Sequence, residues 1–239
     1  MNIAIIGYGK MGKEIKTIAK QRNHNISLVI DINNPLDLNT NNLKNIDVAI
    51  EFTIAKSAPK NYKICFDNNI PVVSGTTAIP NNIFKDIENL VKENKKSFFW
   101  ASNFSVGVNI SFEINRKLAN IMNKFNNYNV EITEIHHKQK IDSPSGTAIT
   151  LANDIIESIE FKNKWVNNIS PRNNELLINS KRIDSVPGTH IVEYFNEIDK
   201  ITLKHEAHNR KGFALGAVLA AEFINNRIGI YNMQDLLSF

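Results

Sequence analysis

The sequence predicts an α/β fold in which a doubly wound parallel sheet is combined with a second, α+β domain containing a mixed sheet. Three observations support this prediction. Short apolar runs alternate with helical patterns in the first part of the chain, which is typical of a parallel sheet with helices on both faces. A glycine-rich loop follows the first apolar run. Later, several strand-like runs follow one another without intervening helices.

The first expected strand, residues 2–6, runs into Gly7-Tyr8-Gly9-Lys10-Met11-Gly12 and then into a helical pattern. This is G-x-G-x-x-G between a strand and a helix, the dinucleotide-binding arrangement of a Rossmann-type fold. There Gly7 permits the tight turn, Gly9 lets the backbone approach a pyrophosphate, and Gly12 lets helix and strand pack closely. We therefore predict that the loop binds a cofactor; a glycine turn without a ligand is the alternative.

A second apolar run, residues 26–30, ends at Asp31, about where this fold places an acid on the adenosine ribose. Asp31 would repel a 2′-phosphate and Ile32 offers no cation, so we predict that NADH is preferred to NADPH. An aspartate that caps a turn is the alternative. The asparagine-rich residues 33–45 are expected to form a connector outside the core.

Further strands are expected at residues 47–52, 71–74 and 97–100, with helices at residues 57–66 and 80–92. Parallel strands end at one edge of the sheet, where ligands bind. The segments that follow the last two strands are therefore candidate cofactor loops: Gly75-Thr76-Thr77 and Ala101-Ser102-Asn103-Phe104.

The second domain is expected to begin after a helix at residues 106–122. It opens with a strand that starts at Val130, and a helix follows from Ala148 to Ile159. Residues 163–171 are expected to form a polar loop. Strand-like runs then cover residues 176–183, 189–195 and 201–206, and a turn at residues 186–189 joins the first two. Helices at residues 215–226 and 233–237 should rejoin the first domain. The expected divisions are 1–105 (dinucleotide binding), 106–209 (second domain) and 210–239 (returning helices).

A cluster of cations lies where the strand of the second domain ends, at His136-His137-Lys138-Gln139-Lys140. After Pro144, Ser145-Gly146-Thr147 begins a helix whose unpaired N–H groups and dipole favour an anion. Successive strand residues point to opposite faces, so the two histidines should do different jobs. For an isolated H-H-K-Q-K, a solvated basic surface or a nucleic-acid patch is the alternative.

The order E-x-x-E-x-H-H-x-x-K-x-D-x-P-S-G-T-A, from Glu131 to Ala148, resembles the signature of the dihydrodipicolinate reductases, also called 4-hydroxy-tetrahydrodipicolinate reductases. G-T-T and A-x-N-F resemble the cofactor-facing loops of that family. The glycine loop is one residue shorter than in many members, which leaves open which N–H groups meet the pyrophosphate. The resemblance implies an NAD(P)H-dependent oxidoreductase that forms tetrahydrodipicolinate in the diaminopimelate route of lysine biosynthesis.

The resemblance also implies roles for individual residues. His136 would be the proton donor, and Lys140 the second donor that polarises the substrate. A small dicarboxylate would be bound by His137, Ser145, Gly146, Thr147 and Thr77. The nicotinamide and its ribose would be bordered by Gly75, Thr76, Thr77, Ala101, Ser102, Asn103 and Phe104. The family's second domain builds a homotetramer, which is expected here as well.

Other chemistry is less well supported. No metal is expected, because His136 and His137 are adjacent and Cys65 stands alone in an apolar helical pattern. Ser145 lacks the G-x-S-x-G context of a nucleophile. Glu131 and Glu134 are expected to be structural partners of the cations. His190, His205 and His208 are expected only to pack or to form loop hydrogen bonds, and Arg210 is left open as a further cation for the pocket.

Composition limits the function classes. The chain has 239 residues, 42% hydrophobic and 22% charged, as in an ordinary globular protein. The net charge of +4 follows the general richness in lysine, so we expect no nucleic-acid partner. With no apolar run of membrane-spanning length and no signal segment, a cytoplasmic location without membrane contact is expected. The alternatives are a reductase of another small anionic imine or aldehyde, and a non-catalytic NAD sensor or nucleic-acid regulator.

Overall fold

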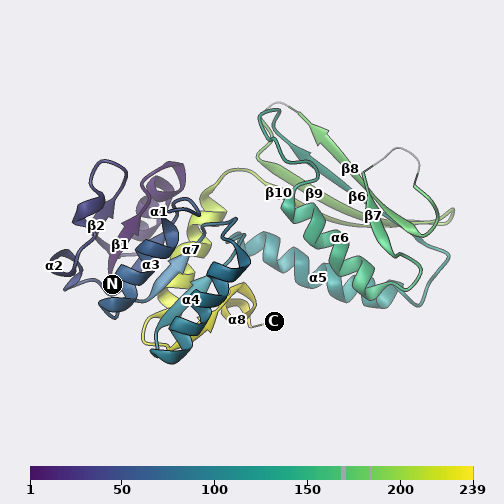
Figure 1. The fold of residues 1–239 in the computed structure, drawn as a ribbon. Coiled ribbons are helices and arrows are strands. Elements are labelled where there is room, and N and C mark those ends of the chain that lie inside the picture. The colour runs from purple at the N-terminus through teal and green to yellow at the C-terminus, as the bar shows by residue number, and fades with distance from the viewer. Residues whose placement is uncertain (168–170, 184, 239) are drawn as a thin grey trace. The chain divides into compact units, whose positions relative to one another are not determined.

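The computed structural model describes residues 1–167, 171–183 and 185–238. The chain forms two compact units (Figure 1). The first consists of Met1–Val106 with Arg210–Phe239, and the second of Gly107–Asn209. In the described part of the chain, no helix combines the length and the hydropathy that crossing a membrane requires.

The first unit is built on a six-stranded parallel sheet with the order β11-β5-β4-β3-β1-β2. The strand order reverses between β1 and β3, as in doubly wound sheets, so the predicted fold class is confirmed. Five strands lie where apolar runs predicted them, whereas the three-residue edge strand β11 was not predicted. The strands are β1 (Asn2–Ile6), β2 (Asn25–Ile30), β3 (Val48–Glu51), β4 (Val72–Ser74), β5 (Ser97–Trp100) and β11 (Gly229–Tyr231).

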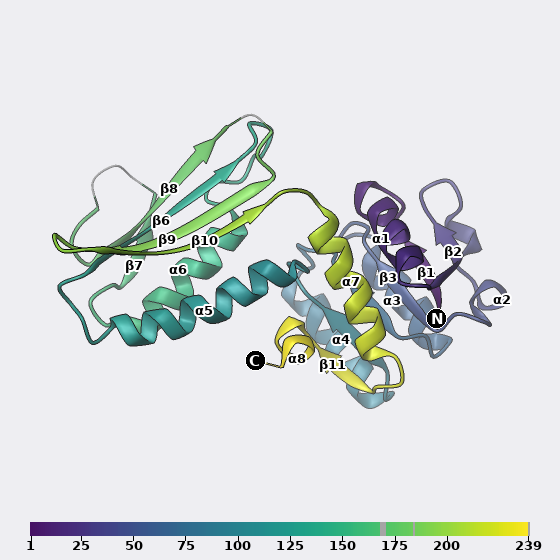
Figure 2. The same ribbon diagram turned by 180° about the vertical axis from the view of Figure 1, so that it is seen from behind.

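Helices cover both faces of this sheet (Figures 1 and 2). Helices α1 (Lys10–Gln21) and α7 (Lys211–Ile224) share one hydrophobic core with the sheet, and α8 (Met233–Leu237) packs beside it. Helices α3 (Ala58–Asp67) and α4 (Asn81–Glu93) share a second core on the other face. Both layers form because apolar residues recur every three or four positions along each helix.

The connector between β2 and β3 was wrongly expected to stay outside the core. It contains the 3₁₀-helix η1 (Pro35–Asp37) and the short helix α2 (Thr40–Leu43). Leu38 and Leu43 are buried in the core beside α3. The asparagines serve as caps: the side chain of Asn39 accepts the N–H groups of the first turn of α2. Two buried leucines are therefore enough to hold a segment whose composition is polar.

The second unit contains a five-stranded mixed sheet with the order β10-β9-β6-β8-β7. The central strand β6 pairs in parallel with β8 and antiparallel with β9, so the turn before β9 joins two strands that lie on either side of β6. Part of the expected polar loop at residues 163–171 is instead the edge strand β7, and residues 168–170 lie outside the described ranges. The strands are β6 (Asn129–His136), β7 (Lys164–Val166), β8 (Glu175–Arg182), β9 (Gly188–Phe195) and β10 (Lys200–Ala207).

Helices α5 (Val106–Met122) and α6 (Gly146–Ser158) pack on one face of this sheet. The side chains of β6 alternate between buried and partly exposed positions, and Val130 and Ile132 point into the core beneath the helices. Because the strand continues without a bulge, Glu134 and His136 point to the same face. The two-residue period of a strand thus carries an acid and a histidine into the interior of the unit.

Candidate active site

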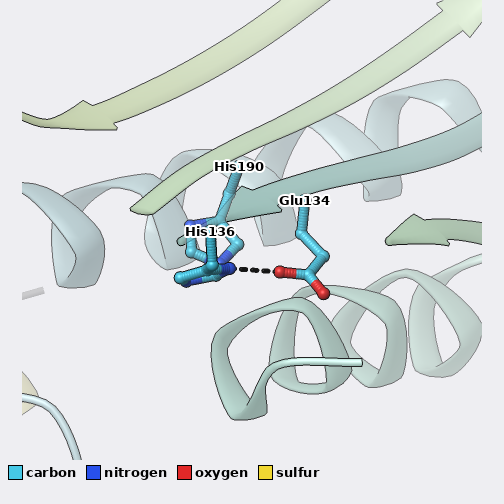
Figure 3. Close-up of side chains that lie close together, drawn as sticks. All are labelled: Glu134, His136 and His190. Atoms are coloured by element: carbon cyan, nitrogen blue, oxygen red, sulfur yellow. Dashed lines mark hydrogen bonds and ion pairs between the residues drawn. The ribbon is translucent and has the colours of Figure 1, made fainter. Parts of the chain in front are cut away.

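The centre of the second unit's site is a carboxylate–imidazole pair at the end of β6 (Figure 3). Glu134 is fully buried and His136 is 7% exposed. Nδ1 of His136 is hydrogen-bonded to Oε2 of Glu134. The other oxygen of this carboxylate, Oε1, lies 2.9 Å from Nη2 of Arg182, the residue opposite His136 in β8. The pair therefore fixes the orientation of the imidazole and directs Nε2 away from Glu134.

Charged neighbours keep the Glu134 carboxyl ionised in spite of its burial. Burial alone would raise its pKa, but interactions with His136, Arg182 and Ser180 outweigh this and lower the pKa to about 2. With Nδ1 held by an anionic carboxylate, Nε2 is the nitrogen of His136 that is available for proton exchange with a ligand.

His190 packs against His136 and is held in the neutral form. Their ring centroids are 5.1 Å apart and the rings are nearly perpendicular (Figure 3). Burial, followed by the positive charge of His136, lowers the pKa of His190 to about 3. Nε2 of His190 lies 3.0 Å from Oγ of Ser145, and Oγ also accepts the N–H of Ala148 at 3.2 Å. The Ser145 hydroxyl can thus donate its proton to His190, which ties the start of α6 to the imidazole cluster.

The first turn of α6 presents backbone N–H groups for which the helix itself has no acceptor. A Cβ atom built on Gly146 would meet nothing within 4 Å, so the approach to this turn is open. The Ser145 hydroxyl is buried and used as the N-cap, and the Thr147 side chain lines a small internal cavity with His190 and His205. An anion at this turn would therefore be met mainly by backbone N–H groups.

Lys140 lies on the turn that follows the histidines. Its Nζ is 2.8 Å from both carboxylate oxygens of Asp142, which lowers the pKa of Asp142. Arg182 donates to the carbonyl oxygen of Asp142 at 2.8 Å while it pairs with Glu134. Arg182 therefore connects the acid at the end of β6 to the turn that carries Lys140. His137, next to this turn, is only partly buried and is not part of the carboxylate–imidazole pair.

Glu134, His136 and His190 offer three potential metal ligands, whose donor atoms lie within 4.8 Å of one another. The contacts of these atoms argue against a cation. Both oxygens of Glu134 already face donors, Nδ1 of His136 is one of those donors, and the Arg182 guanidinium supplies the positive charge that a metal would otherwise provide. Proton transfer suits this cluster better than metal binding.

In the first unit, a pocket of about 560 Å³ lies at the carboxyl ends of the strands. It is found where the strand order reverses between β1 and β3, the place where doubly wound sheets bind their ligands. The lining brings together seven of the predicted cofactor residues with the loop after β3. These are Gly9, Lys10, Met11, Gly12, Gly75, Thr76 and Thr77, together with Phe52, Thr53, Ile54, Ala55 and Ala78.

The glycine loop fits the pyrophosphate of a dinucleotide. Gly7 has φ +99°, and a Cβ there would lie 2.2 Å from the carbonyl oxygen of Phe52. A Cβ on Gly12 would lie 2.2 Å from the carbonyl oxygen of Gly7, whereas one on Gly9 would meet nothing within 4 Å. No side chain caps the start of α1. Gly7 and Gly12 thus pack tightly against the protein backbone, whereas the space beside Gly9 is open to a ligand at the helix N-terminus.

Other predicted cofactor residues lie outside this lining. Oδ1 of Asp31 accepts the N–H of Asn33 at 2.7 Å, so the alternative of a turn-capping aspartate is realised, and Oδ2 has no hydrogen-bond partner among the described residues. Ala101 is largely buried, and Phe104 lies in the core against Phe52. In this segment, Ser102 is exposed and Asn103 is partly exposed. Tyr8 lies beneath the ammonium of Lys16.

We expect acid to destabilise the second unit because two groups bind protons less readily when folded. The pKa of His190 falls from 6.5 to about 3 and that of Glu134 from 4.5 to about 2. The stability that these two groups contribute is complete above pH 6.5. As the pH falls below 6.5, the contribution of His190 is lost, because the unfolded chain then binds a proton that the folded chain does not. Below pH 4.5 the contribution of Glu134 is lost in the same way. Each titrating group should contribute a slope of up to about 1.4 kcal/mol per pH unit. Asp154 acts in the opposite direction, because burial raises its pKa from 3.8 to about 6, and it offsets His190 between these pH values. The contribution of His190 is therefore the difference between the wild type and His190→Gln in denaturant unfolding from pH 7 to 4; identical slopes would contradict this assignment.

A nucleotide-type pocket on a doubly wound sheet, together with a second sheet domain that carries a buried carboxylate–imidazole pair, is typical of a two-domain, nicotinamide-dependent oxidoreductase. The comparisons with known proteins identify the family. The family model described as dihydrodipicolinate reductase, N-terminus, matches residues 1–104, and that described as dihydrodipicolinate reductase, C-terminus, matches residues 107–237. The chain belongs to the dihydrodipicolinate reductase family and is accordingly an oxidoreductase that uses NAD(P)H.

Individual relatives agree over the full length. The chain is 48% identical to the 4-hydroxy-tetrahydrodipicolinate reductase of Christiangramia forsetii, and the match covers 100% of this chain and 98% of the relative. It is 36% identical to the reductase of the same name from Thermosipho africanus, covering 99% and 98%. The structure of dipicolinate-bound dihydrodipicolinate reductase from Paenisporosarcina sp. TG-14 has a TM-score of 0.78 at 24% identity and covers 98% of both chains, which supports the fold.

Proposed function

We propose that this protein catalyses the reduction of 4-hydroxy-tetrahydrodipicolinate to tetrahydrodipicolinate in the diaminopimelate route of lysine biosynthesis. The single observation that carries this proposal is the oriented Glu134–His136 pair beside the open N-terminus of α6. The hydroxyl group leaves as water together with one hydrogen of the adjacent carbon, which gives a conjugated imine, and this imine then takes up a hydride and a proton. A dicarboxylate substrate requires both a proton donor and anion-binding groups, and this cluster offers both.

His136 is the proposed proton donor. Glu134 holds Nδ1, so Nε2 is the nitrogen that delivers the proton to the carbon next to the one that receives the hydride. Gly188 allows this placement, because a Cβ there would lie only 3.0 Å from Nε2 of His136. The cofactor would supply the hydride. The glycine loop, together with Gly75, Thr76 and Thr77, would hold the cofactor in the pocket of the first unit.

The substrate carboxylates are the proposed ligands of the remaining cations and N–H groups. The backbone of Ser145, Gly146 and Thr147 would bind one carboxylate at the start of α6, which the helix dipole favours. His137 and Lys140 would contact the substrate from the adjoining turn. Lys140 would exchange its bond with Asp142 for one with the substrate and polarise it. Thr77 is proposed to contact both cofactor and substrate.

A coupled assay tests the function directly. The protein is mixed with NADH, a dihydrodipicolinate synthase and the substrates of that synthase, and nicotinamide absorbance is followed. We expect oxidation of NADH that depends on the synthase. Turnover only with other imines or aldehydes would favour a reductase of different specificity. NADH binding without turnover would favour a sensor.

Replacing Lys140 by alanine should lower kcat by about 10²-fold and raise the KM for the substrate. The ammonium group supplies positive charge where negative charge develops on the substrate. Asp142→Asn is the matched control: it removes the partner of Lys140 but leaves the ammonium, so kcat should remain within a few-fold of wild type. Steady-state kinetics of the two variants separate the effects. Equal losses in both would mean that the turn matters and the ammonium itself does not.

We propose that NADH is preferred to NADPH. Asp31 keeps one carboxylate oxygen for the ribose hydroxyls, and its exposed neighbour Ile32 offers no positive charge to a 2′-phosphate. Fluorescence titrations should give a lower Kd for NADH, and Asp31→Asn should reduce the difference between the two cofactors. A tenfold or greater preference of the wild type for NADPH would overturn the assignment.

We also propose a homotetramer that assembles through the face of the second sheet opposite α5 and α6, and a cytoplasmic location. Partly exposed apolar side chains, Ile135, Ile191 and Phe195, lie on that face. Light scattering of the purified protein measures the oligomeric state.

A further inference from the structure

A buried carboxylate lies directly behind the cofactor pocket of the first unit. Glu51 ends β3, is fully buried, and forms no ion pair with any residue that the structure describes. Hydroxyl and amide groups surround it instead. Oε2 accepts from Oγ of Ser74 at 2.9 Å and from Oγ1 of Thr76 at 2.8 Å. Oε1 accepts from the backbone N–H of Thr53 at 3.2 Å and from its hydroxyl. Hydrogen-bond donors of the protein thus surround the carboxylate, but no cationic side chain among the described residues pairs with it.

The direction of these hydrogen bonds fits an ionised carboxylate. Oγ of Ser74 accepts the backbone N–H of Thr76 and can accept the hydroxyl proton of Tyr62, so its own proton points to Glu51. Oγ1 of Thr76 accepts the backbone N–H of Thr53, so its proton also points to Glu51. Each of these two hydroxyl oxygens accepts a hydrogen bond from another group, so each hydroxyl donates its own proton to Glu51. An ionised carboxylate, which only accepts, can take all of these hydrogen bonds.

The negative charge acts over some distance in this interior. Burial and then the charge of Glu51 raise the pKa of the Cys65 thiol to about 12, and the pKa of Tyr62 is raised by the same two causes. Two of the hydrogen-bonding partners, Thr53 and Thr76, line the cofactor pocket. These two side chains thus lie between the carboxylate and the pocket. The protein interior has a low dielectric constant, so charges interact strongly there.

We propose that Glu51 is a positioning residue whose buried charge makes the pocket favour the cationic, oxidised nicotinamide ring over the neutral, reduced ring. This inference rests on the proposed function, in which the pocket holds that ring. When the hydride leaves with its electron pair, the ring gains one positive charge. A fixed negative charge stabilises this product and the transition state that leads to it. Thr53 and Thr76, which Glu51 holds in place, set the distance between ring and charge.

The test compares the affinities of the two redox forms. Kd values for NAD⁺ and NADH are measured by calorimetry and fluorescence for the wild type, Glu51→Gln and Glu51→Asp. Glu51→Gln keeps the shape and removes the charge, so the ratio Kd(NAD⁺)/Kd(NADH) should rise about tenfold. Glu51→Asp keeps the charge and should restore a ratio near that of the wild type. A role limited to holding the loops would weaken both forms by the same factor, and that result would overturn the proposal.

A second measurement needs only the wild-type protein, in case Glu51→Gln does not fold. Benzamide adenine dinucleotide has the shape of NAD⁺ but a neutral ring. The wild type should bind NAD⁺ about tenfold more tightly than this analogue, and equal or weaker binding of NAD⁺ would refute the role of the charge. If neither redox form of the cofactor binds at all, the proposed function itself fails. Binding of both forms without a charge effect removes only the inference about Glu51.

Discussion

Replacing His136 by glutamine should lower kcat by about 10²–10⁴-fold and leave the Kd for NADH unchanged. Glutamine can still hydrogen-bond to Glu134, so the end of β6 should keep its geometry. It cannot release a proton, so the substrate carbon that needs one must obtain it from water. The cofactor pocket belongs to the other compact unit and contains no part of β6. Steady-state kinetics give kcat, and fluorescence titration gives the affinity for NADH.

Two further variants make this test specific. His137→Gln changes the neighbouring imidazole, which lies outside the buried pair, and should raise the KM for the substrate more than it lowers kcat. Glu134→Gln retains the volume and removes the negative charge that faces Nδ1 of His136, so kcat should fall. If His136→Gln turns over like the wild type, the proton donor lies elsewhere. If all three variants lose activity equally, the cluster is needed for structure.

The fold was predictable where local patterns are strong. Apolar runs bounded by turns marked β1 to β5, and the glycine loop marked the first crossover. The edge strands β7 and β11 were missed because neither contains a buried residue, unlike the equally short β4, and each forms through pairing with a neighbour, β8 or β5. The connector was misjudged because its two buried leucines are separated by asparagines that cap a short helix. In each case tertiary contact, and not local propensity, determines the structure.

The site was predictable only as far as neighbours in sequence are neighbours in space. His136, Lys140 and the start of α6 lie within one short segment, so their grouping could be read directly. Arg182 and His190 reach this segment because β8 and β9 flank β6 in a register that places them opposite His136 and Glu134. Nothing local specifies that pairing. His190 was interpreted only as a residue for packing or loop hydrogen bonds because the strand register cannot be read from the sequence. The same register also brings His190 to Ser145.

Gly9→Ala and Gly12→Ala should separate cofactor binding from stability in the glycine loop. At Gly9 a methyl group meets nothing within 4 Å and φ is −76°, so the protein can accept it. As an N-cap, alanine is less favourable than glycine by roughly 0.5–1 kcal/mol. The methyl group would occupy the space in front of the α1 N-terminus, where the pyrophosphate must approach. The Kd for NADH should therefore rise at least tenfold, with Tm nearly unchanged.

At Gly12, alanine should lower the stability of the fold and not primarily the affinity for the cofactor. A Cβ there would lie 2.2 Å from the carbonyl oxygen of Gly7, and backbone atoms cannot rotate away as a side chain can. Helix α1 would have to move away from β1, at a cost of about 3 kcal/mol, which corresponds to a fall in Tm of about 6–12 °C. Thermal denaturation and NADH titration of both variants make the comparison. If Gly9→Ala binds NADH like the wild type, no pyrophosphate lies against the N-terminus of α1, and the cofactor must be held by groups other than this loop.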